Sequence, residues 1–217
     1  MKPLLVLAAF PVVLMGWASC SHSGTGHAAL PDPRAVDKSV PEYKNPFHPS
    51  TYAHFVARKD YRKTYDVYKD DTLLNRQPKK SRKIFVCLDE QRGQYLVDGL
   101  VAMDFPLSSG VKAYPTKTGD YAVISKKEDH TSNLYGKMYD AEGKCINYNA
   151  ESTDPIPEGG RFDGSPMPYW QRLTNAGLGL HVGKVRRHPV SHGCVRLPRN
   201  VAEILYRQTS IGTPVTI

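Results

Sequence analysis

Two short apolar runs joined by an Asp-Gly pair constrain the fold of this chain more than any other feature. The runs cover residues 94–97 and 100–105, and Asp98-Gly99 between them is a pair that two-residue β-hairpin turns favour. Other short apolar segments are separated by turn residues and not by helical patterns; they lie at 83–88, 120–124 and 178–182. This spacing predicts an antiparallel or mixed β architecture.

The predicted β domain ends in a helix and a last strand. Pro198 is expected to open the helix, because the first helical turn tolerates proline, and residues 215–217 form the strand. The stretch 135–170 contains four prolines and several glycines. We therefore predict a long irregular loop there, of the kind that often acts as a lid or a binding loop.

The first residues of the chain have the pattern of an export signal. Lys2 precedes an apolar run at 4–17, which is too short for a membrane span of about 20 residues. Small residues then precede Cys20, as in a bacterial lipobox. We expect residues 1–20 to be a signal peptide of the lipoprotein type and Cys20 to carry the lipid, with ordinary cleavage near Ala28 as the alternative. Both versions predict an exported protein.

Residues 21–80 are predicted to form a tether and a helical extension. Five prolines fall between positions 31 and 49 without a regular apolar period. Between 51 and 75, aromatic residues recur mostly every three or four positions, which predicts one or two short helices. The main domain is therefore placed at residues 81–217.

The charge of the chain favours an anionic partner. Lysine and arginine number 29 against 21 acidic residues, which gives a formal net charge of +8. No nucleic-acid-binding motif accompanies this excess. An anionic polymer of the cell envelope is the expected partner, and nucleic acid is not.

Candidate catalytic groups gather at residues 181–197, which read HVGKVRRHPVSHGCVRL. A cysteine is a nucleophile only as its thiolate, and a nearby imidazole can take the proton. Cys194 is thus the candidate nucleophile, with His181 or His192 as its base, while His188 is expected on the loop surface. A zinc site built from the same groups is the alternative. The run contains no carboxylate and three arginines, so we expect neither a metal nor another cofactor.

Export also bears on the remaining cysteines, because oxidising compartments favour disulfides. Cys87 lies in an apolar strand pattern and is expected to be a small buried residue. Cys145 follows a Gly-Lys pair and could lie on the surface or in a strand. The sequence leaves open whether these two cysteines pair.

The sequence SHGCVR at 191–196, with His181 upstream, resembles the signature of the L,D-transpeptidase catalytic domain, the YkuD-type family. Segments 107–110, 114–119, 167–169 and 179–183 are similar to further family segments. Two departures are visible. Lys117 stands where proline is common, and only nine residues separate His181 from Ser191.

The resemblance implies a mainly β fold, a mixed β-sandwich with a few short helices. It also implies acyl transfer between peptides of the bacterial wall. Cys194 would attack the tetrapeptide stem after its third residue, release D-alanine, and pass the acyl group to an amine of a second stem in a 3-3 crosslink. His181 would donate and accept the proton. The remaining residues would orient the loop, form the oxyanion site and bind a stem carboxylate; they are Ser191, His192, Gly193 and Arg196.

Several alternatives remain open at the level of sequence. An L,D-carboxypeptidase, or an enzyme that attaches proteins to the wall, would use the same Cys–His site. A non-catalytic wall-binding lipoprotein would use only the basic surface and would not need Cys194 and His181. In every version we expect the periplasm or the cell envelope as the location, with a membrane surface reached through the lipid on Cys20.

Overall fold

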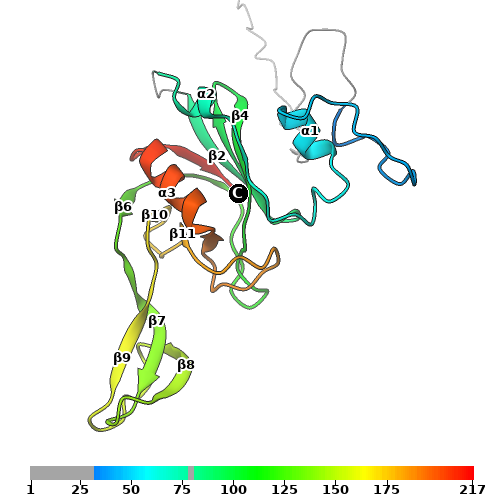
Figure 1. The fold of residues 1–217 in the computed structure, drawn as a ribbon. Helices are drawn as coiled ribbons and strands as arrows, with labels where there is room; N and C mark the ends of the chain where they lie inside the picture. The colour runs from blue at the N-terminus through cyan, green and yellow to red at the C-terminus, as the bar shows by residue number, and fades with distance from the viewer. Residues whose placement is uncertain (1–31, 78–80) are drawn as a thin grey trace, which may run out of the picture.

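The computed structural model describes residues 32–77 and 81–217 (Figure 1). The predicted signal peptide and Cys20 lie outside these residues. The described chain is mainly β with a few short helices, which confirms the expected fold class. Within the described residues, none of the helices has the length and apolar character that crossing a membrane requires.

A six-stranded sheet with the order β1-β4-β3-β2-β13-β5 forms the larger layer. The predicted hairpin is confirmed, with β3 (Arg92–Val97) and β4 (Leu100–Pro106) antiparallel around Asp98 and Gly99. Both turn residues have positive φ, 52° and 77°, as a type I′ turn requires. The other strands are β2 (Arg82–Cys87), β13 (Pro214–Thr216), β5 (Asp120–Ala122) and β1 (Tyr68–Lys69).

A second sheet has four strands in the order β12-β11-β10-β6. They are β12 (Val195–Leu197), β11 (Gly179–Val182), β10 (Trp170–Arg172) and β6 (Ser125–Lys127). Helix α3 (Arg199–Gln208) begins directly after Pro198, as predicted, and buries Val201 and Leu205. These residues join one core with Ile84 and Phe105 of the larger sheet. Burying each such side chain contributes roughly 1.5–3 kcal/mol, so the core fixes the two sheets against each other.

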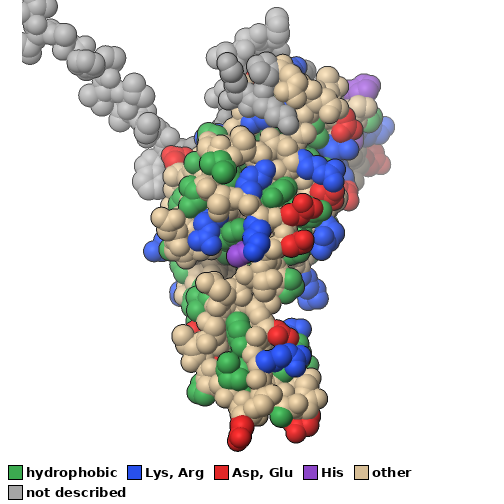
Figure 2. Space-filling model, turned by 90° about the vertical axis from the view of Figure 1, so that its left-hand side faces the viewer, with side chains coloured by type: hydrophobic (Ala, Val, Ile, Leu, Met, Phe, Trp, Pro, Cys, Tyr) green, Lys and Arg blue, Asp and Glu red, His purple; other side chains and the backbone are tan. Residues whose placement is uncertain are grey.

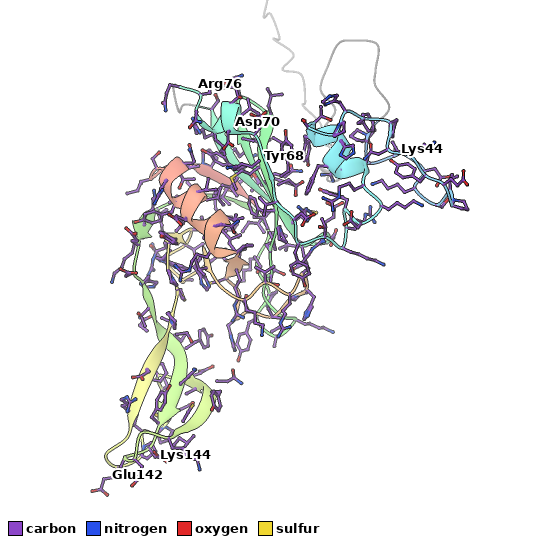
Figure 3. The ribbon with its side chains drawn as sticks, in the orientation of Figure 1. Lys44, Tyr68, Asp70, Arg76, Glu142 and Lys144 are labelled. Carbon is purple, nitrogen blue, oxygen red and sulfur yellow. The ribbon has the colours of Figure 1, made fainter. Side chains whose placement is uncertain are left out.

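A third sheet projects from this body as an arm, which we define as residues 131–166 (Figure 1). It consists of β7 (Thr131–Tyr139), β8 (Cys145–Glu151) and β9 (Arg161–Pro166) in the order β8-β7-β9. The prediction of an irregular loop at 135–170 is therefore wrong. The arm escaped prediction because the prolines and glycines of this stretch indicated a loop, although β8 does show apolar alternation at Ile146, Tyr148 and Ala150. Figure 3 labels Glu142 and Lys144 at its far end.

The chain before β2 packs against the body from residue 32 onward; we call residues 32–75 the N-terminal segment. It contains the short helices α1 (Tyr52–Ala57) and α2 (Asp71–Leu74), in agreement with the predicted helical signal. The side chains of Thr51 and Asp70 cap these helices by accepting backbone N–H groups. Phe55 and Tyr61 form a small core of their own with Val56. Figure 3 labels Tyr68 and Asp70, which lie where this segment joins the body.

Candidate active site

Strand pairing brings the candidate base and the candidate nucleophile to one cavity. Strands β11 and β12 are parallel neighbours, with Leu180 opposite Val195 and His181 opposite Arg196. Cys194 immediately precedes β12, so the same register places it opposite Gly179, two positions before His181 and on the same face of the sheet. Both residues line a cavity of about 630 Å³. The nine-residue gap between His181 and Ser191 therefore still allows both groups to face the same space.

The thiol of Cys194 is half-buried and free. It donates a hydrogen bond to the carbonyl oxygen of Gly177 at 3.3 Å. Burial raises the pKa of this thiol, although the Gly179 backbone and Arg196 act in the opposite direction. The resting thiol is therefore protonated at neutral pH and needs a base before it can attack.

His181 meets the requirement for that base. Its side chain is buried and its Nδ1 lies 2.7 Å from the carbonyl oxygen of Val182. A carbonyl only accepts, so Nδ1 carries the hydrogen and Nε2 keeps the lone pair. Burial, the largest cause, lowers the pKa of His181 to about 4. The imidazole is consequently neutral at physiological pH and can accept a proton at Nε2.

The turn at 191–194 is held from both sides. The Ser191 hydroxyl donates to the Cys194 carbonyl oxygen and accepts the Gly193 N–H at 3.2 Å. The Thr116 hydroxyl donates to the Gly193 carbonyl oxygen at 2.6 Å and accepts the Gly110 N–H. Gly193 has a φ of +110°, which other residues rarely adopt. Ser191 thus braces the turn that carries Cys194 and does not bond a neighbouring histidine.

The same turn decides which N–H groups can face an oxyanion. The Gly193 N–H is already used by Ser191. Within the part of the chain that the structure describes, no hydrogen bond engages the N–H groups of His192 and Cys194. These two are the remaining candidate donors.

His192 contacts the arm. Its exposed ring stacks on Tyr135 of β7, with ring centroids 4.4 Å apart, and lies 4.7 Å from the ring of Tyr114. His188 lies on the exposed loop, as expected, and does not line the cavity.

The cavity wall is cationic. Four basic side chains line it and no aspartate or glutamate does; the four are Lys117, Arg172, Lys184 and Arg196. Arg196 is half-buried, with the backbone of Gly183 packed against its aliphatic carbons. Figure 2 shows basic side chains over the body and hydrophobic side chains continuing along the arm. Such a wall attracts carboxylates.

Sequence reasoning missed an aromatic pair beside His181. The Trp170 ring lies 5.9 Å from the His181 ring, and the His130 ring stacks on Trp170 at 5.1 Å. His130 has no ligand spacing in the sequence and looked incidental, yet it lines the cavity. No local pattern signals these residues, because pairing of β10 with β11 brings Trp170 to His181, and the Met167 N–H holds the His130 carbonyl near the start of β10.

In residues 32–77 and 81–217, no group of three or more His, Cys, Asp or Glu side chains is arranged to hold a metal ion.

Cys145 is a free thiol on the arm and does not pair with Cys87.

Comparison with known proteins decides the family. The sequence model of the L,D-transpeptidase catalytic domain, YkuD, matches residues 81–217. The chain belongs to this family. A curated relative is "Probable L,D-transpeptidase 3" of Mycobacterium tuberculosis (strain H37Rv), 31% identical over 119 residues. The match covers 52% of this chain and 37% of that L,D-transpeptidase, so the chain spans little more than a third of its length.

Solved structures of L,D-transpeptidases are also similar. One from Mycobacterium smegmatis has 21% identity and a TM-score of 0.48, covering 62% of this chain and 57% of that one. One from Enterococcus faecium has 28% identity and a TM-score of 0.45, covering 62% and 48%.

Proposed function

We propose that this L,D-transpeptidase family member crosslinks peptidoglycan stem peptides through Cys194. The observation that carries the proposal is the placement of Cys194 and the neutral His181 on one cavity from neighbouring strands. A neutral imidazole beside a protonated thiol is one arrangement that activates a cysteine, because the imidazole can take the thiol proton.

The first half of the reaction forms a thioester. His181 Nε2 takes the thiol proton, and the Cys194 sulfur attacks the carbonyl of the third stem residue. The tetrahedral oxyanion faces the N–H groups of His192 and Cys194, each such donor being worth about 2.7–4 kcal/mol of transition-state stabilisation. Collapse breaks the peptide bond, and His181 returns the proton to the amine of the departing D-alanine.

The second half transfers the acyl group. An amine of a second stem attacks the thioester carbonyl, His181 accepts the proton from this amine, and the Cys194 sulfur leaves. Proton return to the sulfur restores the thiol. Water in place of the amine would give a tripeptide, which is the L,D-carboxypeptidase outcome.

The cationic wall supports a substrate rich in carboxylates. Stem peptides carry several carboxylates, and Arg196 presents a guanidinium shaped for bidentate contact with one of them. Arg172 and Lys184 extend the same charge along the cavity.

We further propose that the enzyme is exported to the periplasm or cell envelope and held at a membrane surface by lipid on Cys20. The apolar run at 4–17 and the small residues before Cys20 support this part.

Incubation of the purified protein with tetrapeptide muropeptides, followed by mass analysis, tests the activity. We expect crosslinked dimers from the wild type and none from Cys194→Ala. Cys145→Ala is the matched control, because it removes the other free thiol of the described residues without touching the cavity. Activity that survives in Cys194→Ala, or a wild type that forms neither dimers nor tripeptides, would contradict the proposal.

A further inference from the structure

We propose that the N-terminal segment is a positioning element of the active site, which holds the loop at 183–191 through Arg187 and Tyr65. The inference rests on the proposed function, because this loop joins His181 to the turn that carries Cys194. The segment precedes the residues that match the family domain, which begin at position 81. A part of the chain outside the family match would therefore help to set the catalytic geometry.

Among the described residues, hydrogen bonds from the main chain of the loop to the main chain of the catalytic domain occur only at the two ends of the loop. At its beginning, Gly183 N–H donates to the Leu197 carbonyl oxygen at 3.0 Å. At its end, the N–H groups of Val190 and Ser191 both donate to the Ser109 carbonyl oxygen, at 2.8 and 3.0 Å. The middle of the loop depends on side chains.

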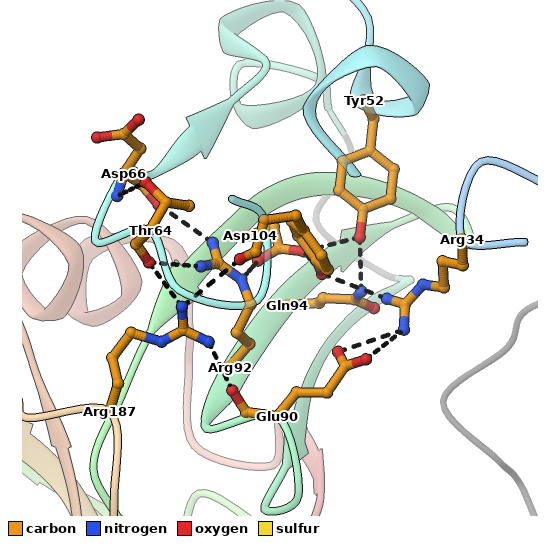
Figure 4. Close-up of polar contacts among 10 residues, drawn as sticks. Arg34, Tyr52, Thr64, Asp66, Glu90, Arg92, Gln94, Asp104 and Arg187 are labelled. Carbon is orange, nitrogen blue, oxygen red and sulfur yellow. Dashed lines mark hydrogen bonds and ion pairs between the residues drawn. The ribbon is translucent and has the colours of Figure 1, made fainter. Parts of the chain in front are cut away.

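Arg187 supplies the main contact in that middle. Its guanidinium donates to the carbonyl oxygens of Thr64 at 2.9 Å and Glu90 at 2.8 Å (Figure 4). A longer bond of 3.5 Å reaches the carbonyl oxygen of Tyr61. One side chain thus joins the loop to the N-terminal segment and to the turn between β2 and β3.

The backbone of Arg187 indicates that this contact sets the loop conformation. Its φ is +55°, in the left-handed region that residues other than glycine rarely adopt. Such conformations persist where the surroundings over-determine them. The carbonyl acceptors of Tyr61, Thr64 and Glu90 provide those surroundings.

Tyr65 adds a second contact from the same segment. Its hydroxyl donates to the carbonyl oxygen of Arg186 at 3.1 Å. The Arg186 N–H in turn donates to the Ser108 hydroxyl at 2.8 Å. The loop is therefore held on one side by the N-terminal segment and on the other by the domain.

The segment can position the loop because it is itself fixed to a buried ion pair. Arg92 and Asp104 have side chains 1% and 0% exposed. Arg92 donates to the Thr64 carbonyl oxygen that Arg187 also uses, at 3.2 Å. The Tyr52 and Tyr61 hydroxyls donate to Asp104 at 2.7 and 2.8 Å (Figure 4). Loop, segment and sheet form one continuous network.

The decisive comparison is Arg187→Met against Arg62→Met. Both remove one positive charge by the same exchange, but Arg62 is exposed and takes part in none of the hydrogen bonds named above. For Arg187→Met we expect kcat for dimer formation to fall about 100-fold, the cost of a small misplacement of reacting groups, with KM little changed. Arg62→Met should match the wild type. Arg187→Lys should recover part of kcat, because an ammonium can still reach one carbonyl.

A second readout does not need the substrate. The rate of Cys194 alkylation by iodoacetamide is measured against pH, with mass spectrometry of the peptide that carries Cys194. Burial raises the pKa of this thiol in the wild type. A loosened loop exposes it, so the midpoint should move to lower pH in Arg187→Met and not in Arg62→Met. Tyr65→Phe, which removes one exposed hydroxyl, should shift the midpoint in the same direction but by less. This variant replaces Arg187→Met in the test if Arg187→Met does not fold.

Unchanged kcat and alkylation profile in folded Arg187→Met, or in Tyr65→Phe if only that variant folds, would overturn the proposal. So would a loss of activity that only follows the unfolded fraction. Failure of the proposed function can be told apart from failure of this inference. If the proposed function is wrong, the wild type forms no dimers, but the alkylation profiles of the variants still report on the loop.

Discussion

The body and the arm line the same cavity but are stabilised in opposite ways. On the body side, the Arg92–Asp104 pair is almost fully buried and is bonded to two tyrosine hydroxyls. On the arm, the buried hydrophobic side chains are Met138 and Ala150, and β7 is held chiefly by main-chain pairing with β8 and β9.

This difference separates two tasks. In the proposed reaction, Cys194 and His181 must keep their geometry to transfer protons, and both lie on the side with a shared core and multiple hydrogen bonds. The arm contributes Tyr135 and Tyr148 to the cavity from strands that bury few hydrophobic side chains. We therefore expect the arm to adjust to different acceptor stems while the Cys–His geometry stays fixed.

The largest effect is expected from Asp104→Asn on the body side. It leaves the Arg92 guanidinium buried without a counter-charge, which costs about 3–5 kcal/mol of unfolding free energy. Urea denaturation measures this loss. A loss of unfolding free energy below about 1 kcal/mol would mean that the buried ion pair of the body contributes no more than an exposed ion pair on the arm, which would contradict the comparison.

Acid should weaken the body through His181. Its pKa is lowered to about 4 in the folded state against 6.5 ordinarily, so the unfolded chain binds more protons between these values. Unfolding free energy should therefore fall by up to about 3 kcal/mol from pH 6.5 to 4. His181→Gln removes the titrating group and should give a flatter curve over that window. Parallel curves for the two proteins would contradict the assignment.

A change confined to the arm should act locally. In Gly164→Ala the added methyl would meet the carbonyl oxygen of Ser132, where β9 runs antiparallel to β7. We expect about 1–3 kcal/mol of local strain. Amide hydrogen exchange should become faster in residues 131–166, while the exchange rates in the body stay unchanged. Equal acceleration in both regions would show that the arm and the body unfold together.

The smallest effect is expected from Asp163→Asn. Its ion pair with Arg161 is exposed, with side chains 49% and 56% accessible, and such pairs contribute less than about 1 kcal/mol. Measured by urea beside Asp104→Asn, this variant gives the matched contrast between the two regions. A cost similar to that of Asp104→Asn would break the comparison.

The sequence predicted those parts of the molecule whose signals are local. Asp98 and Gly99 marked the hairpin, and Pro198 marked the start of α3, because backbone conformation at these sites depends on the residue itself. The arm was missed because its prolines and glycines indicated a loop, and the alternation of Ile146, Tyr148 and Ala150 in β8 was too short to outweigh them.

The same distinction holds within the site. The run at 181–197 indicated Cys194 and His181 directly. It could not indicate His130 or Trp170, which strand pairing places beside His181. The contacts of Arg187 were equally hidden, because all three acceptors are carbonyl groups that every residue possesses; they belong to Tyr61, Thr64 and Glu90.

The parallel pairing of β13 with β2 governs the order in which the molecule can fold. Val215 pairs with Ile84 on one side and with Tyr121 on the other, so the last strand fills a gap inside the larger sheet. Until it arrives, the apolar edge of β2 stays open to pairing with other chains. A ribosome delivers residues 214–216 long after β2, and contacts so distant in sequence close slowly. A nascent chain therefore needs protection of this edge until synthesis has passed residue 216.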